Sequence, residues 1–178
     1  MKGSIFFFGG AFDPLTKFHE KIIMKLDSQL EDNDILLIGV SSVVNYKNYM
    51  LPVNDRLDMI HDFINNHCSH NVLVIEQKER TYDFIKNLDK KWDKFWGHDR
   101  VFVVIGDDEW RDLHDKRNWA HSEELLEECL FITIPRGNEP SSTTARKLLN
   151  ENAFDEALSE ILSENVINVC RKFVESQK

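Results

Sequence analysis

SIFFFGGAFDPLTKFH, residues 4–19, contains a short apolar run, a pair of glycines and the start of a helical pattern. The run Ser4–Phe8 shows no alternation of polar and apolar residues, which is typical of a strand buried on both faces. From Phe18 onward apolar residues recur every four positions, as on the buried face of a helix: Phe18, Ile22, Leu26 and Leu30. A buried strand, a glycine loop and a helix in this order predict the first unit of a parallel α/β sheet.

The alternation of strand and helix continues to residue 135. Four more apolar runs predict buried strands, namely Ile35–Ser41, Val72–Ile75, Val101–Ile105 and Leu130–Pro135. Helical spacing separates several of these runs, in the sets Leu57, Ile60, Ile64 and Tyr82, Ile85, Leu88, Trp92, Phe95. We therefore predict an α/β fold, a doubly wound, Rossmann-like, mainly parallel five-stranded sheet with helices on both faces and a C-terminal helical cap.

The helical cap is predicted from the pattern beyond Pro135. Ser142 or Thr143 is the expected cap of a helix that runs to about Asn150. Two further helices are marked by Phe154, Leu158, Leu162 and by Val166, Val169, Cys170, Phe173. No linker or repeat interrupts the 178 residues, of which 42% are hydrophobic. We expect a single domain over residues 1–178, whose helical C-terminal part covers about residues 141–178.

Charge and composition exclude several classes of partner. Lys and Arg number 22 against 31 Asp and Glu, so the net charge is −9 and a non-specific nucleic-acid surface is not expected. The longest apolar runs are far too short to span a membrane, and the first residues do not resemble a secretory signal. The three cysteines Cys68, Cys129 and Cys170 form no motif. We expect a soluble cytoplasmic protein that binds neither nucleic acid nor membrane.

A zinc site is the less favoured interpretation of one His-rich segment. His61, His67 and His70 lie close to Cys68 in the sequence. Their spacing fits no standard structural zinc site. We predict no metal bound by protein ligands alone.

The loop after the first strand is the first place to look for chemistry, because ligands of open α/β sheets bind at the carboxyl ends of the strands. Gly9 and Gly10 allow a phosphate to come close to main-chain N–H groups. His19 follows in the first helical turn, where the helix dipole favours an anion. The alternative is that the glycines only make a tight turn and His19 is an ordinary helix residue.

Three segments resemble the nucleotidyltransferase superfamily. Gly9–His19 resembles its GGxFDP signature, which is followed by His/Thr-x-Gly-His or a close variant. Ser141-Ser142-Thr143-Thr144-Ala145-Arg146 resembles the ISSTxxR motif at the start of a helix, and Ile105-Gly106-Asp107-Asp108 resembles the IGxD segment after the fourth strand. The first and last motifs occur in the expected order, which is far more specific than either one alone.

Two other segments resemble the nicotinate and nicotinamide mononucleotide adenylyltransferases within that superfamily. Trp119 followed by Glu123-Glu124-Leu125-Leu126 resembles their W-x-x-x-E-x-L stretch. Ser42–Lys47, with Leu51-Pro52 and Arg56, resembles their substrate loop after the second strand. The resemblance extends over roughly residues 4–175 and implies transfer of AMP from ATP to a pyridine mononucleotide, with release of pyrophosphate, in NAD biosynthesis.

The resemblance implies a role for each matched residue. Backbone groups of Gly9, Gly10, Ala11 and Phe12, the Thr16 hydroxyl and the His19 ring N–H would contact phosphates. Ser141, Ser142 and Thr143 would form a second anion site with Arg146 as a forked donor. Gly106 and Asp107 would bind nucleotide, with Asp107 contacting a ribose or the pyridine amide, and Lys47, Arg56, Trp119 and Arg136 would bind substrate. Mg²⁺ would arrive on the ATP phosphates.

Each of these residues also has a structural interpretation that the sequence leaves open. Ser141–Thr143 can simply cap a helix, and Asp107 with Asp108 can bind metal or cap the helix after Gly106. Lys47 and Arg56 can be solvated charges, and Trp119 can cover an edge of the core.

The chain departs from the family pattern at three places. Phe18 occupies a position where many members carry glycine, and Thr16 stands where the bacterial nicotinate enzymes have histidine. Only residues 136–140 separate the fifth predicted strand from the serine motif. Another small nucleotidyltransferase, of the phosphopantetheine or cytidylyl kind, or a non-catalytic nucleotide-binding protein, therefore remains an alternative. The choice between nicotinate and nicotinamide mononucleotide, and whether the chain forms a homo-oligomer, also stays open.

Overall fold

A computed structural model describes residues 3–43, 49–69, 71–92, 100–115 and 119–178, without the side chains of 89–92. Its sheet has five strands in the order β3-β2-β1-β4-β5, and every neighbouring pair is parallel. The strands are β1 (Ser4–Gly10), β2 (Ile35–Ser41), β3 (Val72–Gln77), β4 (Arg100–Gly106) and β5 (Leu130–Ile134). The predicted doubly wound sheet is confirmed, and the strand order reverses between β1 and β4.

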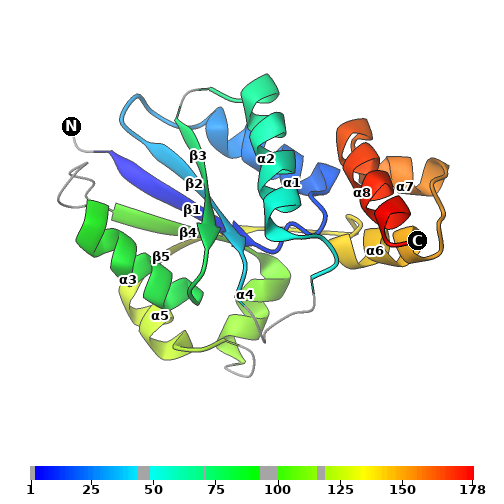
Figure 1. The fold of residues 1–178 in the computed structure, drawn as a ribbon. Coiled ribbons are helices and arrows are strands. Elements are labelled where there is room, and N and C mark those ends of the chain that lie inside the picture. The colour runs from blue at the N-terminus through cyan, green and yellow to red at the C-terminus, as the bar shows by residue number, and fades with distance from the viewer. Residues whose placement is uncertain (1–2, 44–48, 70, 93–99, 116–118) are drawn as a thin grey trace.

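Helices cover both faces of the sheet (Figure 1). On one face lie α1 (Lys17–Asp27) and α2 (Val53–His67), and on the other lie α3 (Thr81–Trp92), α4 (Asp107–His114) and α5 (Ser122–Glu128). The helical tail consists of α6 (Ser142–Asn150), α7 (Glu156–Ile161) and α8 (Glu164–Ser176). In this view it lies beside α1 and α2, beyond the carboxyl ends of the strands.

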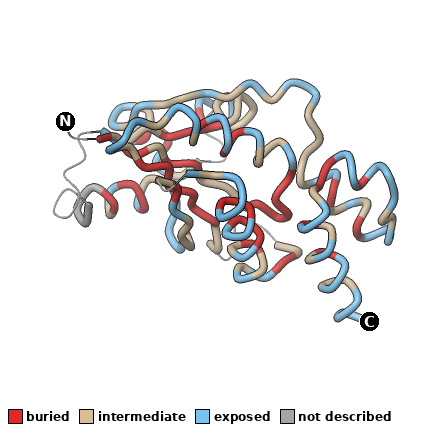
Figure 2. Tube along the Cα trace, turned by 90° about the horizontal axis from the view of Figure 1, so that it is seen from above, coloured by how far each residue is buried: buried red, intermediate tan, exposed pale blue. Residues whose placement is uncertain are grey.

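Two apolar cores follow from the alternation of side chains along the strands. Phe8 of β1 belongs to the core under α1 and α2, whereas Phe7 belongs to the core under α3 to α5. Strands of a parallel sheet are buried on both faces, which is why β2 is apolar along nearly all of its length. Figure 2 shows the buried residues gathered along the middle of the trace, with exposed residues on its outer turns.

The helical tail extends the first core. Leu149, Leu158, Val166 and Cys170 are buried in the same cluster as residues of α1 and α2. A hydrogen bond from Lys17 Nζ to the Ser159 carbonyl, 2.6 Å long, joins α1 to α7. The predicted cap therefore packs on the sheet's helices through apolar side chains. None of the helices in the described ranges is long and apolar enough to cross a membrane.

The structure corrects three predicted boundaries. Gly9 and Gly10 belong to β1 and pair with Gly39 and Val40 of β2, so the loop begins after the glycine pair. A Cβ at Gly9 would lie 2.9 Å from the Phe7 ring, so the side chain of Phe7 occupies the space that glycine leaves. The cap of α6 is Ser141, which precedes both predicted positions, Ser142 and Thr143. Helix α1 ends at Asp27, before Leu30, although Leu30 still packs against the first core.

Candidate active site

Two adjoining pockets open at the carboxyl ends of the strands, and residues of β1 and β4, between which the strand order reverses, line both of them. Each has a volume of about 440 Å³. We call the first the motif pocket, because residues of Phe8–Asp13, His19, Arg136, Ser141–Thr143 and Arg146 line it. The second is the Trp119 pocket, lined also by Gln77, Arg80 and Asp112. Gly9, Gly10, Ala11, Tyr49 and Glu109 line both pockets.

His19 is held in one tautomer by the start of α1. Its Nδ1 accepts a hydrogen bond from the backbone N–H of Thr16 at 3.1 Å. Because a backbone N–H can only donate, Nδ1 carries no proton, and the proton of the neutral ring is on Nε2. Burial, and then the charge of Arg136, lower the pKa of His19 from 6.5 to about 4. The motif pocket therefore contains a neutral imidazole with an N–H donor at pH 7.

Thr16 does not have the position that the sequence predicts. Its side chain is buried, caps α1 by accepting from the His19 backbone N–H, and lies 3.0 Å from His19 Nδ1. It is not among the described residues that line either pocket. Direct donation from its hydroxyl to a phosphate is therefore a poor fit, because the hydroxyl is enclosed between the helix end and the imidazole. Thr16 orients His19 instead.

The two sequence motifs meet at Arg146. Its Nη1 donates to the carbonyl oxygen of Asp13 at 2.6 Å, and its Nη2 donates to Thr143 Oγ1 at 3.0 Å. Ser141 Oγ caps α6 by accepting from the Thr144 N–H, and Ser142 Oγ donates to the Pro14 carbonyl at 3.0 Å. The serine motif thus caps α6, as its structural interpretation predicts, and it also lines the motif pocket. The proposed phosphate contacts of these residues stay predictions.

Arg136 enters the motif pocket from the short connection after β5. Its Nη1 donates to Asp108 Oδ2 at 2.9 Å, and its guanidinium lies 5.9 Å from the centre of the Phe18 ring. Its backbone N–H donates to Asp107 Oδ1 at 3.1 Å. Gly106 lines the motif pocket, whereas Asp107 is not among the described lining residues. Asp107 therefore braces the connection, and its predicted contact with a ribose or a pyridine amide finds no support in this position.

Arg56 is a structural residue, contrary to its predicted place in the substrate site. The side chain is 1% exposed. It donates to the carbonyl oxygens of Leu51, Ala11 and Ser41, at 3.1, 2.7 and 2.8 Å. Its guanidinium also lies 4.1 Å from the centre of the Tyr49 ring. The Nε and Nη1 donors of Arg56 are used on backbone carbonyls inside the protein, so Arg56 holds the loops around the pockets, and its predicted contact with substrate stays a prediction.

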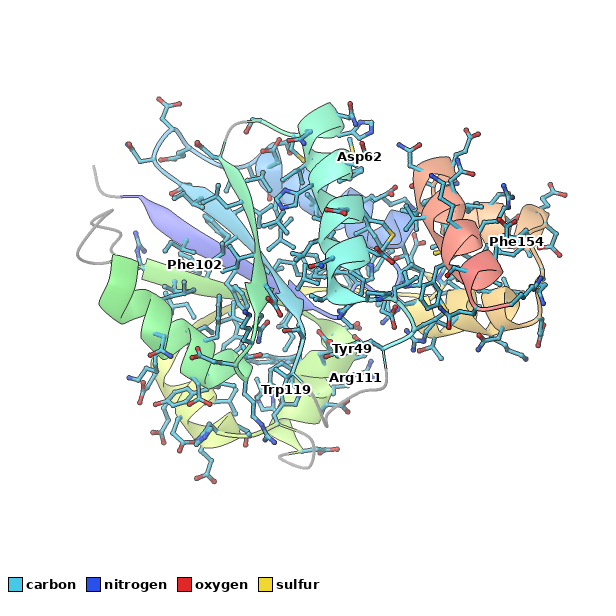
Figure 3. The ribbon with its side chains drawn as sticks, viewed as in Figure 1. Tyr49, Asp62, Phe102, Arg111, Trp119 and Phe154 are labelled. Carbon is cyan, nitrogen blue, oxygen red and sulfur yellow. The ribbon has the colours of Figure 1, made fainter. Side chains whose placement is uncertain are left out.

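The remaining predicted substrate residues have different outcomes. Lys47 lies outside the described residues. Trp119 lines the Trp119 pocket and is also packed against the second core. Its surroundings therefore agree with both interpretations, a contact with substrate and a cover for the edge of the core. Figure 3 shows Trp119 and Tyr49 at the same end of the sheet, beyond the ends of β2 and β3.

Several residues of this site were missed at the level of sequence. Tyr49, Gln77, Arg80, Glu109 and Asp112 line the Trp119 pocket. Gln77 is the last residue of β3, and its Nε2 donates to the Glu79 carbonyl at 3.0 Å, which shapes the turn that carries Arg80. The signal was available, because these residues end or follow strands whose carboxyl ends lie at one edge of the sheet.

Metal ligation by clustered side chains has no support in the described parts of the chain. No group of three or more His, Cys, Asp or Glu side chains within those ranges has the arrangement needed to hold an ion. His70, part of the less favoured zinc interpretation, lies outside those ranges. Burial, followed by the nearby Asp27, raises the pKa of Cys68 to about 11, so this thiol is protonated at neutral pH.

Comparison with known proteins agrees with the resemblance seen in the sequence. A family model described as cytidylyltransferase-like matches residues 7–148. A Fusobacterium nucleatum protein described as "probable nicotinate-nucleotide adenylyltransferase" is 26% identical over 144 residues, which cover 80% of this chain and 73% of the relative. A Lactococcus lactis phosphopantetheine adenylyltransferase is 28% identical over the full length of both chains.

A solved structure shares the fold. The Plasmodium falciparum nicotinic acid mononucleotide adenylyltransferase complexed with NaAD has a TM-score of 0.71 at 18% identity, and the match covers 97% of this chain and 96% of that one. This chain spans between about half and three quarters of the length of the first curated relatives.

The state of the His19 imidazole gives a direct test of this geometry. We expect its NMR titration midpoint near pH 4 in the free protein, with Nδ1 unprotonated at pH 7. The unfolded chain binds the proton near the ordinary pKa of 6.5, so this residue lowers the unfolding free energy progressively as the pH falls from about 6.5 to about 4. Pyrophosphate in the motif pocket should raise the midpoint, since its negative charge favours the imidazolium. A midpoint near 6.5 in the free protein would contradict the enclosed ring.

Proposed function

The chain belongs to the cytidylyltransferase-like family, and on that premise we propose that it is an adenylyltransferase that transfers AMP from ATP to a pyridine mononucleotide. The observation that carries the proposal is the junction of the two motifs. Arg146 of α6 donates to Asp13 of the first loop, and both segments line one pocket with His19. The names of the relatives support the pyridine acceptor, because most of them are described as nicotinate-nucleotide adenylyltransferases.

The reaction asks for alignment and charge stabilisation rather than a covalent intermediate. An oxygen of the acceptor phosphate forms a bond to the α-phosphorus of ATP. The bond from the α-phosphorus to the oxygen that bridges to the β-phosphorus breaks, and pyrophosphate leaves. Negative charge grows on the α-phosphoryl oxygens and the leaving group. A neutral imidazole N–H from His19, the guanidinium of Arg146 and the N-terminal N–H groups of α6 are suitable donors for these oxygens.

A divalent cation fits this pocket only as a companion of ATP. Both carboxylate oxygens of Asp13 accept backbone N–H groups, from Met50 at 2.7 Å and Leu51 at 2.9 Å, and Asp108 is paired with Arg136. These carboxylates are engaged, and guanidinium groups share the pocket. Mg²⁺, which often keeps its waters and binds substrate phosphates, would be held by ATP and would neutralise the leaving pyrophosphate.

The Trp119 pocket is the proposed site of the acceptor. Trp119 and Tyr49 offer aromatic surfaces for a flat pyridinium ring, which an indole attracts by stacking and by its quadrupole. Arg80 is the one cation among the described residues that line this pocket, and Glu109 and Asp112 supply negative charge. A nicotinate ring carries both a positive nitrogen and a negative carboxylate, so it matches a pocket that contains both signs.

Phosphopantetheine is the second candidate acceptor, because the Lactococcus lactis relative matches this chain from end to end. It would undergo the same reaction with ATP in the motif pocket. It has no ring to stack on Trp119, so the two acceptors differ in what they need from the Trp119 pocket.

The activity test is pyrophosphate release from ATP and Mg²⁺ with three acceptors: nicotinate mononucleotide, nicotinamide mononucleotide and phosphopantetheine. We expect release with a pyridine mononucleotide. His19→Ala should lower kcat by about 10²- to 10³-fold, the scale for one preorganised donor, with a smaller change in KM for ATP. His61→Ala, an exposed histidine of α2, is the matched control. Absence of release with every acceptor would favour a non-catalytic nucleotide-binding protein.

Trp119→Ala tests the pyridine ring. We expect the acceptor affinity to fall by about three- to thirty-fold, because stacking and quadrupole attraction amount to roughly 0.5 to 2 kcal/mol. KM for ATP and the melting temperature should change little. A lower melting temperature with normal acceptor affinity would assign Trp119 to the core and count against a pyridine acceptor.

Arg80→Gln tests the carboxylate. We expect the ratio of kcat/KM for nicotinate over nicotinamide mononucleotide to fall by about ten- to a hundredfold, because a hydrogen bond to a charged group contributes about 1.5 to 3 kcal/mol. Lys78→Gln is the control, since Lys78 pairs with Glu76 and is not among the residues described in the pocket wall. Equal losses with both acceptors would show that Arg80 contacts a group that they share, such as the phosphate.

A further inference from the structure

Phe12 has a backbone conformation that a bulky residue rarely adopts. Its φ is +47°, in the left-handed region, where side chains other than those of glycine, asparagine and aspartate are uncommon. It lies in the first loop, directly before Asp13, and lines the motif pocket. Strained backbone of this kind persists only where the surrounding structure enforces it, and it is often found at functional sites. The surroundings of the Phe12 ring therefore need an explanation.

The ring is enclosed on several sides. Phe12 is 2% exposed, and its ring centre lies 5.4 Å from that of Phe8 in an edge-on arrangement with an interplanar angle of 83°. A Cβ at Gly10 would lie only 3.1 Å from the ring atoms Cε2 and Cζ. Glycine at position 10 therefore leaves the space into which the Phe12 ring packs.

The same ring also packs against the His19 imidazole. The two ring centres are 5.1 Å apart, with an interplanar angle of 70°. The imidazole also accepts the Thr16 N–H at Nδ1. The hydrogen bond from Thr16 fixes Nδ1 as the acceptor nitrogen, and the contact with the Phe12 ring limits rotation of the imidazole plane. Together they determine where the Nε2 proton points.

We propose that Phe12 is a positioning residue for His19, and that the left-handed backbone at Phe12 serves to turn its ring inward against the imidazole. The proposal rests on the role of His19 in the proposed function. It assigns to this aromatic side chain an effect on the orientation of the donor rather than a contact with a reacting atom. Loss of the ring should therefore weaken stabilisation of the transition state more than binding of ATP.

The test compares two large-to-small changes in the same core. Phe12→Leu removes the ring beside His19, and Phe63→Leu removes a similarly buried ring of α2, whose aromatic neighbour is His67. Both variants should melt at lower temperature than the wild type. We expect only Phe12→Leu to lower kcat, by about tenfold or more, with KM for ATP within about twofold. Phe63→Leu should keep the wild-type kcat.

The His19 imidazole provides a readout that needs no turnover. In Phe12→Leu its NMR titration midpoint should move from about 4 toward the ordinary value of 6.5, because water reaches the loosened ring. In Phe63→Leu it should not move. If the wild type proves inactive with every acceptor, the proposed function fails, and the positioning role is still decided by this titration.

Two results would overturn the proposal. One is a folded Phe12→Leu protein with the His19 midpoint and kcat of the wild type. The other is an equal loss of kcat in Phe12→Leu and Phe63→Leu, which would reduce the effect to general stability. If Phe12→Leu does not fold, Phe12→Met, which keeps most of the volume without a planar ring, is measured in its place.

Discussion

The buried carboxylate of Asp13 joins three segments that are far apart in the chain. It accepts the backbone N–H groups of Met50 and Leu51, which precede α2, and one of its oxygens lies 3.9 Å from the Arg146 guanidinium of α6. At 1% exposure such a charge is tolerated only when it is fully paired and hydrogen-bonded. The first loop, the approach to α2 and the start of α6 are therefore held together by one group, and the motif pocket lies where they meet.

Arg56 is the cationic counterpart of Asp13. It donates to carbonyl oxygens at Ala11, Ser41 and Leu51, so it holds the acceptor groups of the same loops whose N–H groups Asp13 holds. Leu51 is bound at both ends, its N–H by Asp13 and its carbonyl oxygen by Arg56. Among the described residues that line the motif pocket, the basic side chains are Arg136, Arg146 and His19, and these are the groups that we propose to recognise the anion.

The sequence predicted the fold well because period and burial are local signals. Apolar runs located all five strands, and the helical spacing of apolar residues located α1, α2, α3, α7 and α8, since both patterns depend on which face of an element is buried. Most of the residues singled out in the first and the serine motif line the motif pocket, and both motifs lie within residues 7–148, which the family model matches. Thr16 and Arg56 look like free donors in a sequence, whereas in the structure both have partners inside the protein. Only the tertiary structure shows that a helix end and three backbone carbonyls already use them.

Two features that the sequence marked as departures from the family pattern, Phe18 and the connection of residues 136–140, lie together in the structure. The short connection brings Arg136 to the pocket, where its guanidinium lies over the Phe18 ring and pairs with Asp108 of α4. The Phe18 ring thus offers the Arg136 guanidinium an aromatic face. Burial is the larger cause of the lowered pKa of His19, and the charge of Arg136 adds to it, so the residue that the connection brings to the pocket also favours the neutral imidazole.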